Sequence, residues 1–272
     1  MTDLTLRPGK KLYFASDFHL GSAPIERSAL REKQVVRWLE QIRVDAQAIY
    51  LVGDIFDFWH EYRTAIPKGF VRFLGKLVEL KDSGIDIQIF TGNHDIWMND
   101  YFPNEFGIPV HHQPIAFSVQ SAKQQKNFYV GHGDGLGPGD YGYKHVLKPI
   151  FTNPVLQFLF RWLHPDVGIT LAHTWARHTR ASKAGKPHEF FKAADTEWIY
   201  QYCREIEAQQ HHDYYVFGHR HLVLDMPVAE NSRYVNLGEW MYVRSYAVYD
   251  GQDVRLQIFE NDPNLLIPAN RK

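Results

Sequence analysis

Five short segments of the chain place metal-binding side chains directly after runs of apolar residues. The segments read SDFHLG, GDIFDFW, GNHD, GHGD and GHRH. Their polar side chains are those of Asp17, His19, Asp54, Asn93, His94, Asp95, His132, His219 and His221. Carboxylate and imidazole ligands without thiolate suit borderline or hard divalent ions such as manganese, iron, zinc or magnesium. The residue types therefore predict metal-assisted chemistry.

The spacing of these side chains favours two ions rather than one. Asp17 and His19 are two residues apart, so along an extended chain both side chains project to the same side. His219 and His221 repeat that spacing, and Asp54 offers a carboxylate that can bridge two ions. In two-metal sites the ions lie about 3.5–4 Å apart, activate water and clamp a phosphoryl group. The pattern thus predicts hydrolysis of a phosphate ester.

Taken singly, each of these residues also has a structural explanation. Asp17 or Asp54 after a strand can cap the next helix, and Asn93 can form a turn beside its glycine. A lone histidine such as His132 or His219 is commonly a core or loop residue. The functional interpretation depends on their combination: each of five predicted strands is followed by such a residue or pair of residues. In α/β folds, ligands bind beyond the carboxyl ends of the strands.

The segments that must position these side chains alternate between strand and helix patterns. Apolar residues recur at helical spacing within 35–42 and 70–80. Strand and helix in alternation indicate a βαβ architecture with sheets buried between helices. The predicted strands are 11–16, 48–53, 85–92, 127–133 and 214–219. The end of the chain differs, because 233–238, 245–251 and 254–260 follow one another without helices and predict an antiparallel meander.

One region interrupts this alternation, and we interpret it as an insertion. Residues 141–194 are aromatic and basic, contain several prolines and have helical rather than strand spacing. They predict a helical cap over the sheet, with 1–140 and 195–272 as the core. Within the cap, one helical face is apolar and wider than a solvent-facing helix needs. Its residues are Val155, Leu156, Phe158, Leu159, Phe160, Trp162 and Leu163.

Length and composition indicate a soluble chain with either one large domain or a domain plus a sizeable insertion. The 272 residues are 44% hydrophobic and carry a formal net charge of -1, which gives no general attraction to nucleic acid. A nuclease also needs a longer basic track with stacking aromatics than 177–186 provides. The single cysteine, Cys203, fits a reducing compartment. We therefore expect a cytoplasmic protein without a signal peptide, a spanning helix or a nucleic-acid partner.

The motifs D-x-H, G-D, G-N-H-D, G-H and G-H-x-H, in this order, resemble those of the calcineurin-like metallophosphoesterases. The resemblance spans residues 17–221 and implies an α/β fold, a four-layer α-β-β-α sandwich, here with an inserted helical cap. It implies that His94 is catalytic and faces the substrate phosphate, supported by Asp95. Its implied ligands are Asp17, His19 and His221 for one ion, Asn93, His132 and His219 for the other, and Asp54 as the bridge.

The segments GDIFDFW, HGDGLGPGDYGY and 153–185 resemble a bacterial branch of this family, the UDP-2,3-diacylglucosamine pyrophosphatases of lipid A synthesis. This resemblance implies hydrolysis of UDP-2,3-diacylglucosamine to UMP and 2,3-diacylglucosamine 1-phosphate, with two manganese ions, at the cytosolic face of the inner membrane. The substrate contacts that we predict are Asn93, His94, Asp140, Thr179, Arg180, Lys183 and Lys186.

The sequence leaves several alternatives open. The apolar cap face can line an acyl groove, touch a bilayer or pack on a partner helix, and its basic flank suits a diphosphate or an anionic membrane surface. The best-known members of that branch carry arginine where this chain has His94, so another phosphoester, on a nucleotide or a protein, stays an alternative substrate. A non-catalytic scaffold on this fold would lack ligands, whereas all seven positions are filled here. The sequence indicates no oligomeric state.

Overall fold

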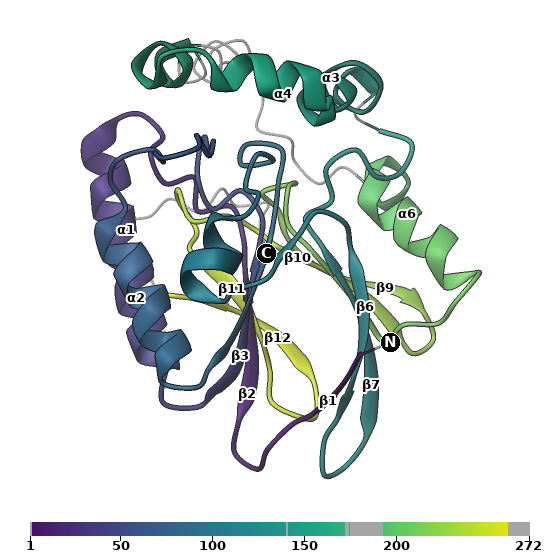
Figure 1. Ribbon diagram of the computed structural model, residues 1–272. Helices are drawn as coiled ribbons and strands as arrows, with labels where there is room; N and C mark the ends of the chain where they lie inside the picture. Colours follow the sequence, from purple (N-terminus) through teal and green to yellow (C-terminus); the bar gives the residue numbers. More distant parts are fainter. Residues whose placement is uncertain (1, 140, 172–173, 175–192, 261–272) are drawn as a thin grey trace.

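The computed structural model describes residues 2–139, 141–171, 174 and 193–260, and two six-stranded sheets form its centre (Figure 1). One sheet has the order β12-β11-β2-β3-β4-β5, with bounds Val254–Ile258, Ser245–Tyr249, Lys11–Ala15, Ala46–Val52, Asp86–Phe90 and Val110–His111. The other has the order β1-β6-β7-β8-β10-β9, with bounds Thr2–Thr5, Ile115–Gln120, Gln125–Gly131, Tyr214–Phe217, Ser232–Leu237 and Val223–Ala229.

Three separate hydrophobic cores show that the sheets are stacked between helices. The first lies between α1 (Ile25–Ile42), α2 (Val71–Asp82) and the β2-containing sheet. The second joins the facing sides of the two sheets, and the third joins the β8-containing sheet to α6 (Trp198–Glu207). The predicted four-layer α-β-β-α architecture is therefore confirmed. Both helices on the first sheet bury the apolar stripe that the sequence predicts, for example at Leu39 and Leu77.

The strand directions bring the predicted ligands to one edge of the molecule. β2, β3 and β4 are parallel, so their carboxyl ends meet at the same side of the sheet. In the second sheet β7 and β8 are also parallel, and both end next to segments of the predicted site. Since ligands bind beyond the carboxyl ends of strands in α/β sheets, this topology assembles a site from segments far apart in sequence.

The expected antiparallel meander at the end of the chain is wrong. β10 pairs in parallel with β8 and antiparallel with β9, whereas β11 and β12 form an antiparallel pair in the other sheet. The chain crosses between the sheets within 238–244, where Gly238 has a φ of 75° that favours glycine. All three runs carry inward-facing apolar residues, and an alternating pattern does not state which sheet a strand joins.

The described part of the predicted cap, 141–171 with 174, 193 and 194, is mainly helical and lies above the carboxyl ends of the strands (Figure 1). It contains the π-helical turn η2 (Tyr143–Leu147), α3 (Lys148–Thr152) and α4 (Pro154–Arg161), and 165–171 are also helical. Two further short turns are η1 (Phe102–Phe106) and η3 (Ala194–Thr196). The boundaries at 141 and 194 stay predictions. Among the described helices, none combines the length and apolar content needed to cross a membrane.

An aromatic contact region attaches the cap to the core. The indole Nε1–H of Trp97 donates a hydrogen bond to the carbonyl of Phe151, at 2.7 Å. The ring of Phe160 packs against the rings of Trp97 and His60, with centroids 4.7 and 4.8 Å apart. Phe160 therefore anchors α4 to the core, while no residue of that helix is fully buried.

Candidate metal centre

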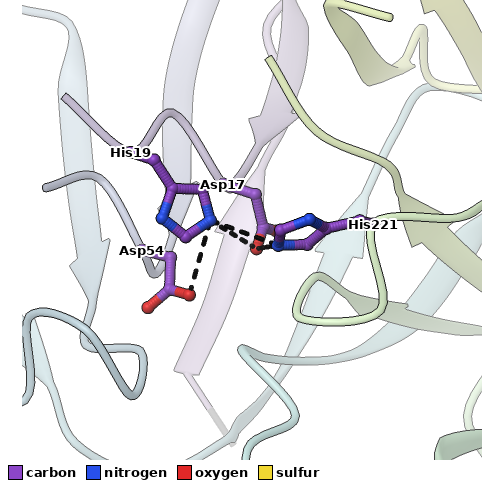
Figure 2. Close-up of side chains that lie close together, drawn as sticks. All are labelled: Asp17, His19, Asp54 and His221. Atoms are coloured by element: carbon purple, nitrogen blue, oxygen red, sulfur yellow. Dashed lines mark hydrogen bonds and ion pairs between the residues drawn. The ribbon is translucent and has the colours of Figure 1, made fainter. Parts of the chain in front are cut away.

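Four of the predicted ligands converge where β2, β3 and β8 end (Figure 2). His221 Nε2 lies 3.1 Å from Asp17 Oδ1, and His19 Nε2 lies 3.7 Å from the same oxygen. The Nε2 atoms of the two imidazoles are only 3.2 Å apart. With Asp54, these side chains offer ligand atoms that all lie within 4.8 Å of one another. Such convergence of carboxylate oxygen and imidazole nitrogen suits a divalent cation.

The remaining predicted ligands form a second half beside the first. Asp54 Oδ2 lies 3.7 Å from His19 Nε2 on one side and 3.4 Å from His132 Nε2 on the other. His219 Nδ1 lies 2.9 Å from Asn93 Oδ1, and the rings of His132 and His219 are 5.2 Å apart. One carboxylate oxygen therefore stands between both halves, in the position that a bridging ligand requires.

The backbone reaches this arrangement by a route that we did not predict. We expected Asp17 and His19 to share an extended exit, but both have positive φ, 57° and 46°. Five of the seven predicted ligands adopt this left-handed conformation, namely Asp17, His19, Asp54, His219 and His221. It costs about 1–3 kcal/mol for each non-glycine residue and is concentrated at functional sites. Tight left-handed turns, not strand periodicity, aim these side chains inward.

Glycines beside the ligands provide the space that the turns need. A Cβ atom on Gly92 would lie 2.2 Å from Asp54 Oδ1, and one on Gly218 would lie 2.6 Å from Asp17 Oδ2. Neither distance is compatible with a side chain, since real Cβ contacts are longer than 3.0 Å. The glycines in GNHD and GHRH are therefore required by close packing around the carboxylates.

Asp95 has a different task from the one we predicted. Its carboxylate accepts backbone N–H groups from Gly92 at 2.7 Å, from Ile55 at 2.8 Å, and more distantly from the neighbours of Ile55. Burial, then the charge of Asp54, raises its pKa to about 7. Asp95 thus holds the loop that carries Asp54 against the GNHD turn, and it is a positioning residue for the bridge.

Asp57 occupies the supporting position that we assigned to Asp95. His94 Nδ1 lies 3.0 Å from the carbonyl oxygen of Asp57 and 3.8 Å from its carboxylate. The same carboxylate lies 3.7 Å from His19 Nδ1, so Asp57 faces both rings. The signal was present in GDIFDFW, three residues after Asp54, but an acidic residue inside an aromatic run does not by itself indicate which ring it faces.

The loop that carries His219 and His221 is held by contacts of its neighbouring residues with the rest of the protein. The guanidinium of Arg220 forms an ion pair with Glu197 at 3.0 Å and stacks 3.6 Å above the ring of Trp198. The amide of Asn236 donates a hydrogen bond to the carbonyl of Gly218 at 2.7 Å. These contacts hold both imidazoles in place without using their ring nitrogens.

The charges of the cluster fit cations. Burial alone would raise the pKa of Asp17, but His221 and then His19 outweigh it and lower that pKa. Burial likewise opposes a charge on His132, yet Asp54 raises its pKa to about 10. The buried, ionised carboxylates are therefore stabilised by positive charge nearby. Divalent ions supply this charge and require neutral imidazoles, so their binding displaces protons.

Buried polar atoms without hydrogen-bond partners show where such ions fit. Among the described residues, Asp17 Oδ1 and His132 Nε2 are fully buried and lack a hydrogen-bonding partner. His132 Nδ1 donates to the carbonyl of Val52 at 2.8 Å, which leaves Nε2 as the free lone pair. Unsatisfied buried groups are costly, and metal ligation is the interaction that their geometry favours.

The predicted cap contacts cannot be placed. Asp140, Thr179, Arg180, Lys183 and Lys186 lie outside the described residues. Of the predicted substrate contacts, Asn93 and His94 lie at the metal centre and are both partly exposed. Their roles stay predictions.

Comparison with known proteins agrees with the class of protein that the fold and the metal centre define. The chain belongs to the calcineurin-like phosphoesterase family, whose pattern matches residues 10–223. It is 37% identical to a UDP-2,3-diacylglucosamine hydrolase of Porphyromonas gingivalis, across 92% of this chain and 98% of that one. A protein of the same name from Haemophilus ducreyi is 27% identical, across 86% and 93%. A solved dimetal phosphatase from Danio rerio is 12% identical, covering 93% and 96%, with a TM-score of 0.44.

Proposed function

We propose that this protein hydrolyses the pyrophosphate bond of UDP-2,3-diacylglucosamine, giving UMP and 2,3-diacylglucosamine 1-phosphate. The observation that carries the proposal is the joint presence of two features. Seven side chains that can ligate metals lie close together, with the Asp54 carboxylate between the two halves of the cluster. A cap with an exposed apolar helix lies above the carboxyl ends of the strands that carry this cluster (Figure 1). The two relatives described above carry the name of this activity.

Two divalent ions fit the centre, and we propose manganese. Asp17, His19 and His221 would hold one ion, Asn93, His132 and His219 the other, and Asp54 would contact both. When bound, the ions supply Lewis-acid activation of water and neutralise charge on the phosphoryl group. The protein contributes a fixed set of ligands in a mostly buried site, which limits reorganisation during the reaction.

His94 is the residue that we assign to the substrate phosphate. Its backbone N–H donates to Asp54 Oδ1 at 2.9 Å, and its Nδ1–H donates to the carbonyl of Asp57. This tautomer leaves Nε2 for the substrate. Burial, joined by His19, lowers the pKa of His94, although Asp54 and Asp57 oppose that shift. An anionic phosphate nearby favours the protonated ring, which then stabilises charge on the leaving group.

The exposed face of α4 supports a lipid substrate. Phe158 and Leu159 on α4 and Trp162 directly after it are 57%, 56% and 77% exposed, so no helix of the described part of the chain covers them. Contiguous exposed apolar side chains of this size mark a binding surface. We propose that acyl chains lie along this face, and that it brings the protein to the cytosolic surface of the inner membrane.

We expect Phe158→Ser combined with Trp162→Ser to raise KM for the diacylated substrate by about tenfold or more, since burial of each large apolar side chain contributes about 1.5–3 kcal/mol. Hydrolysis of a small aryl phosphodiester should not change, because that substrate has no acyl carbon to bury. Steady-state kinetics with both substrates measures the difference.

Val71→Ser serves as the matched control, because Val71 is 76% exposed on α2 and lies outside the cap. It should leave both KM values unchanged. Equal losses on the two substrates in the double variant would mean that Phe158 and Trp162 only maintain the fold.

The proposed activity is tested with purified protein on UDP-2,3-diacylglucosamine and on a simple aryl phosphodiester. We expect UMP release with manganese, loss of that release after chelation, and its return when manganese is added back. Hydrolysis of the aryl phosphodiester alone would support phosphoesterase activity but exclude UDP-2,3-diacylglucosamine as the substrate. Another phosphoester would then be the substrate.

A further inference from the structure

A cavity with both polar and apolar lining lies between the core and the cap. Its volume is about 150 Å³. Thr91, Asn99, Gln113 and Asp134 line it from the core, and Lys148 and Gln157 line it from the cap. It is therefore a separate space from the exposed apolar face of α4, although both use the same helix.

The cavity borders two segments that carry predicted metal ligands. Thr91 precedes the ligand Asn93 by two residues, and Asp134 follows the ligand His132 by two. A narrower hollow shares Thr91, Gln113 and Asp134 with the cavity and reaches His132 itself. A group bound in the cavity would thus lie near a phosphate at the metals.

The walls of the cavity are held by charged and polar contacts. Lys148 Nζ donates to Asp134 Oδ2 at 2.9 Å and to its carbonyl oxygen at 3.0 Å. The hydroxyl of Tyr143 donates to the same carboxylate oxygen at 3.0 Å. These bonds join the cap to the loop after β7 and form the cavity before any occupant arrives, which reduces the cost of binding.

The size and the lining fit one planar polar ring. A cavity of about 150 Å³ admits a six-membered ring the size of benzene, and here carboxamides and hydroxyls share the lining with apolar groups. Gln157 Nε2 donates to the carbonyl of Phe151 at 2.7 Å, and Asn99 Nδ2 donates to the carbonyl of Trp97 at 3.2 Å. Both side chains keep their amide oxygens as acceptors, and the exposed Gln113 carboxamide offers donor and acceptor.

We propose that this cavity binds the uracil ring of the substrate and that Asn99, Gln113 and Gln157 recognise its edge. The inference rests on the proposed function. Uracil presents an N–H donor between two carbonyl acceptors, which complements carboxamides. The diacylated sugar does not suit the cavity, because its acyl chains need apolar surface, and α4 offers that surface on its exposed side. A purine is larger than the single ring that the cavity admits.

Titration calorimetry on the manganese-loaded protein tests this assignment with three probes: UMP, AMP and ribose 5-phosphate. The wild type should bind UMP at least about tenfold more tightly than ribose 5-phosphate, which lacks the base, and more tightly than AMP. Asn99→Ala combined with Gln113→Ala should raise the Kd for UMP by about tenfold and leave ribose 5-phosphate unaffected. Gln125→Ala, at an exposed glutamine at the start of β7, is the control and should bind all three like the wild type.

An unchanged Kd for UMP in the double variant would overturn the assignment. Equal weakening of UMP and ribose 5-phosphate would also overturn it, because the residues would then act on the sugar phosphate or on folding. AMP binding as tight as UMP binding would exclude a pyrimidine cavity. If UMP binding depends on these residues while UDP-2,3-diacylglucosamine is not hydrolysed, the cavity assignment stands and the proposed substrate fails.

Discussion

Asp54→Asn is expected to lower kcat by ~10²–10⁴-fold and to reduce the metal content of the purified protein. The carboxylate stands between both halves of the centre, 3.7 Å from His19 and 3.4 Å from His132. Bound metal ions contribute several kcal/mol of charge stabilisation in the transition state, and each 1.36 kcal/mol corresponds to a factor of ten in rate. Activity assays and elemental analysis of the same preparation measure both effects.

The variant should keep its fold, because asparagine has the shape of aspartate and the Asp95 contacts to the backbone of this loop are unchanged. Circular dichroism checks this point. Asp82→Asn, at an exposed aspartate at the end of α2, should match the wild type in activity and metal content. Near-normal turnover in Asp54→Asn would contradict the two-metal interpretation.

His94→Ala is expected to lower kcat by ~10²–10⁴-fold, the usual contribution of a positioned acid or base, with little change in metal content. In contrast, His132→Ala should lower both, since His132 Nε2 is buried, unpartnered and beside Asp54. Comparing kcat and bound manganese in the two variants separates a residue that contacts the substrate from one that contacts an ion.

The positions of three side chains would explain a loss of bound metal in His94→Ala. His19, Asp57 and His94 also offer ligand atoms within 4.8 Å of one another. Loss of an ion in His94→Ala, as large as the loss in His132→Ala, would place His94 in the ligand set and leave the leaving group without its assigned residue.

Much of the site is predictable from the sequence because the type of each residue determines which ligand atoms it can offer. Asp17, His19 and Asp54 follow strands, and parallel strands end at one edge, so chain topology alone brings them together. The four layers follow for a similar reason, since amphipathic helices such as α1 must cover a sheet face.

The geometry inside the site depends on contacts that no local pattern states. Left-handed turns at His19 and His221 aim the rings, and they persist because the surrounding packing determines them. Asp95 follows His94 directly in sequence and was expected to support its ring, but the fold places Asp57, 37 residues earlier in the chain, beside that ring. Likewise, β10 joins the β8-containing sheet, whereas β11 and β12 join the β2-containing sheet. An alternating apolar pattern fits a buried position in either sheet.

Hydrolysis of UDP-2,3-diacylglucosamine in oxygen-18 water, followed by mass spectrometry of both products, tests the proposed reaction most directly. With acyl chains on α4 and the diphosphate across the metal centre, water should attack the phosphorus next to uridine. We predict one heavy oxygen in UMP and none in 2,3-diacylglucosamine 1-phosphate. Label in the lipid phosphate, or no UMP at all, would contradict the proposed reaction.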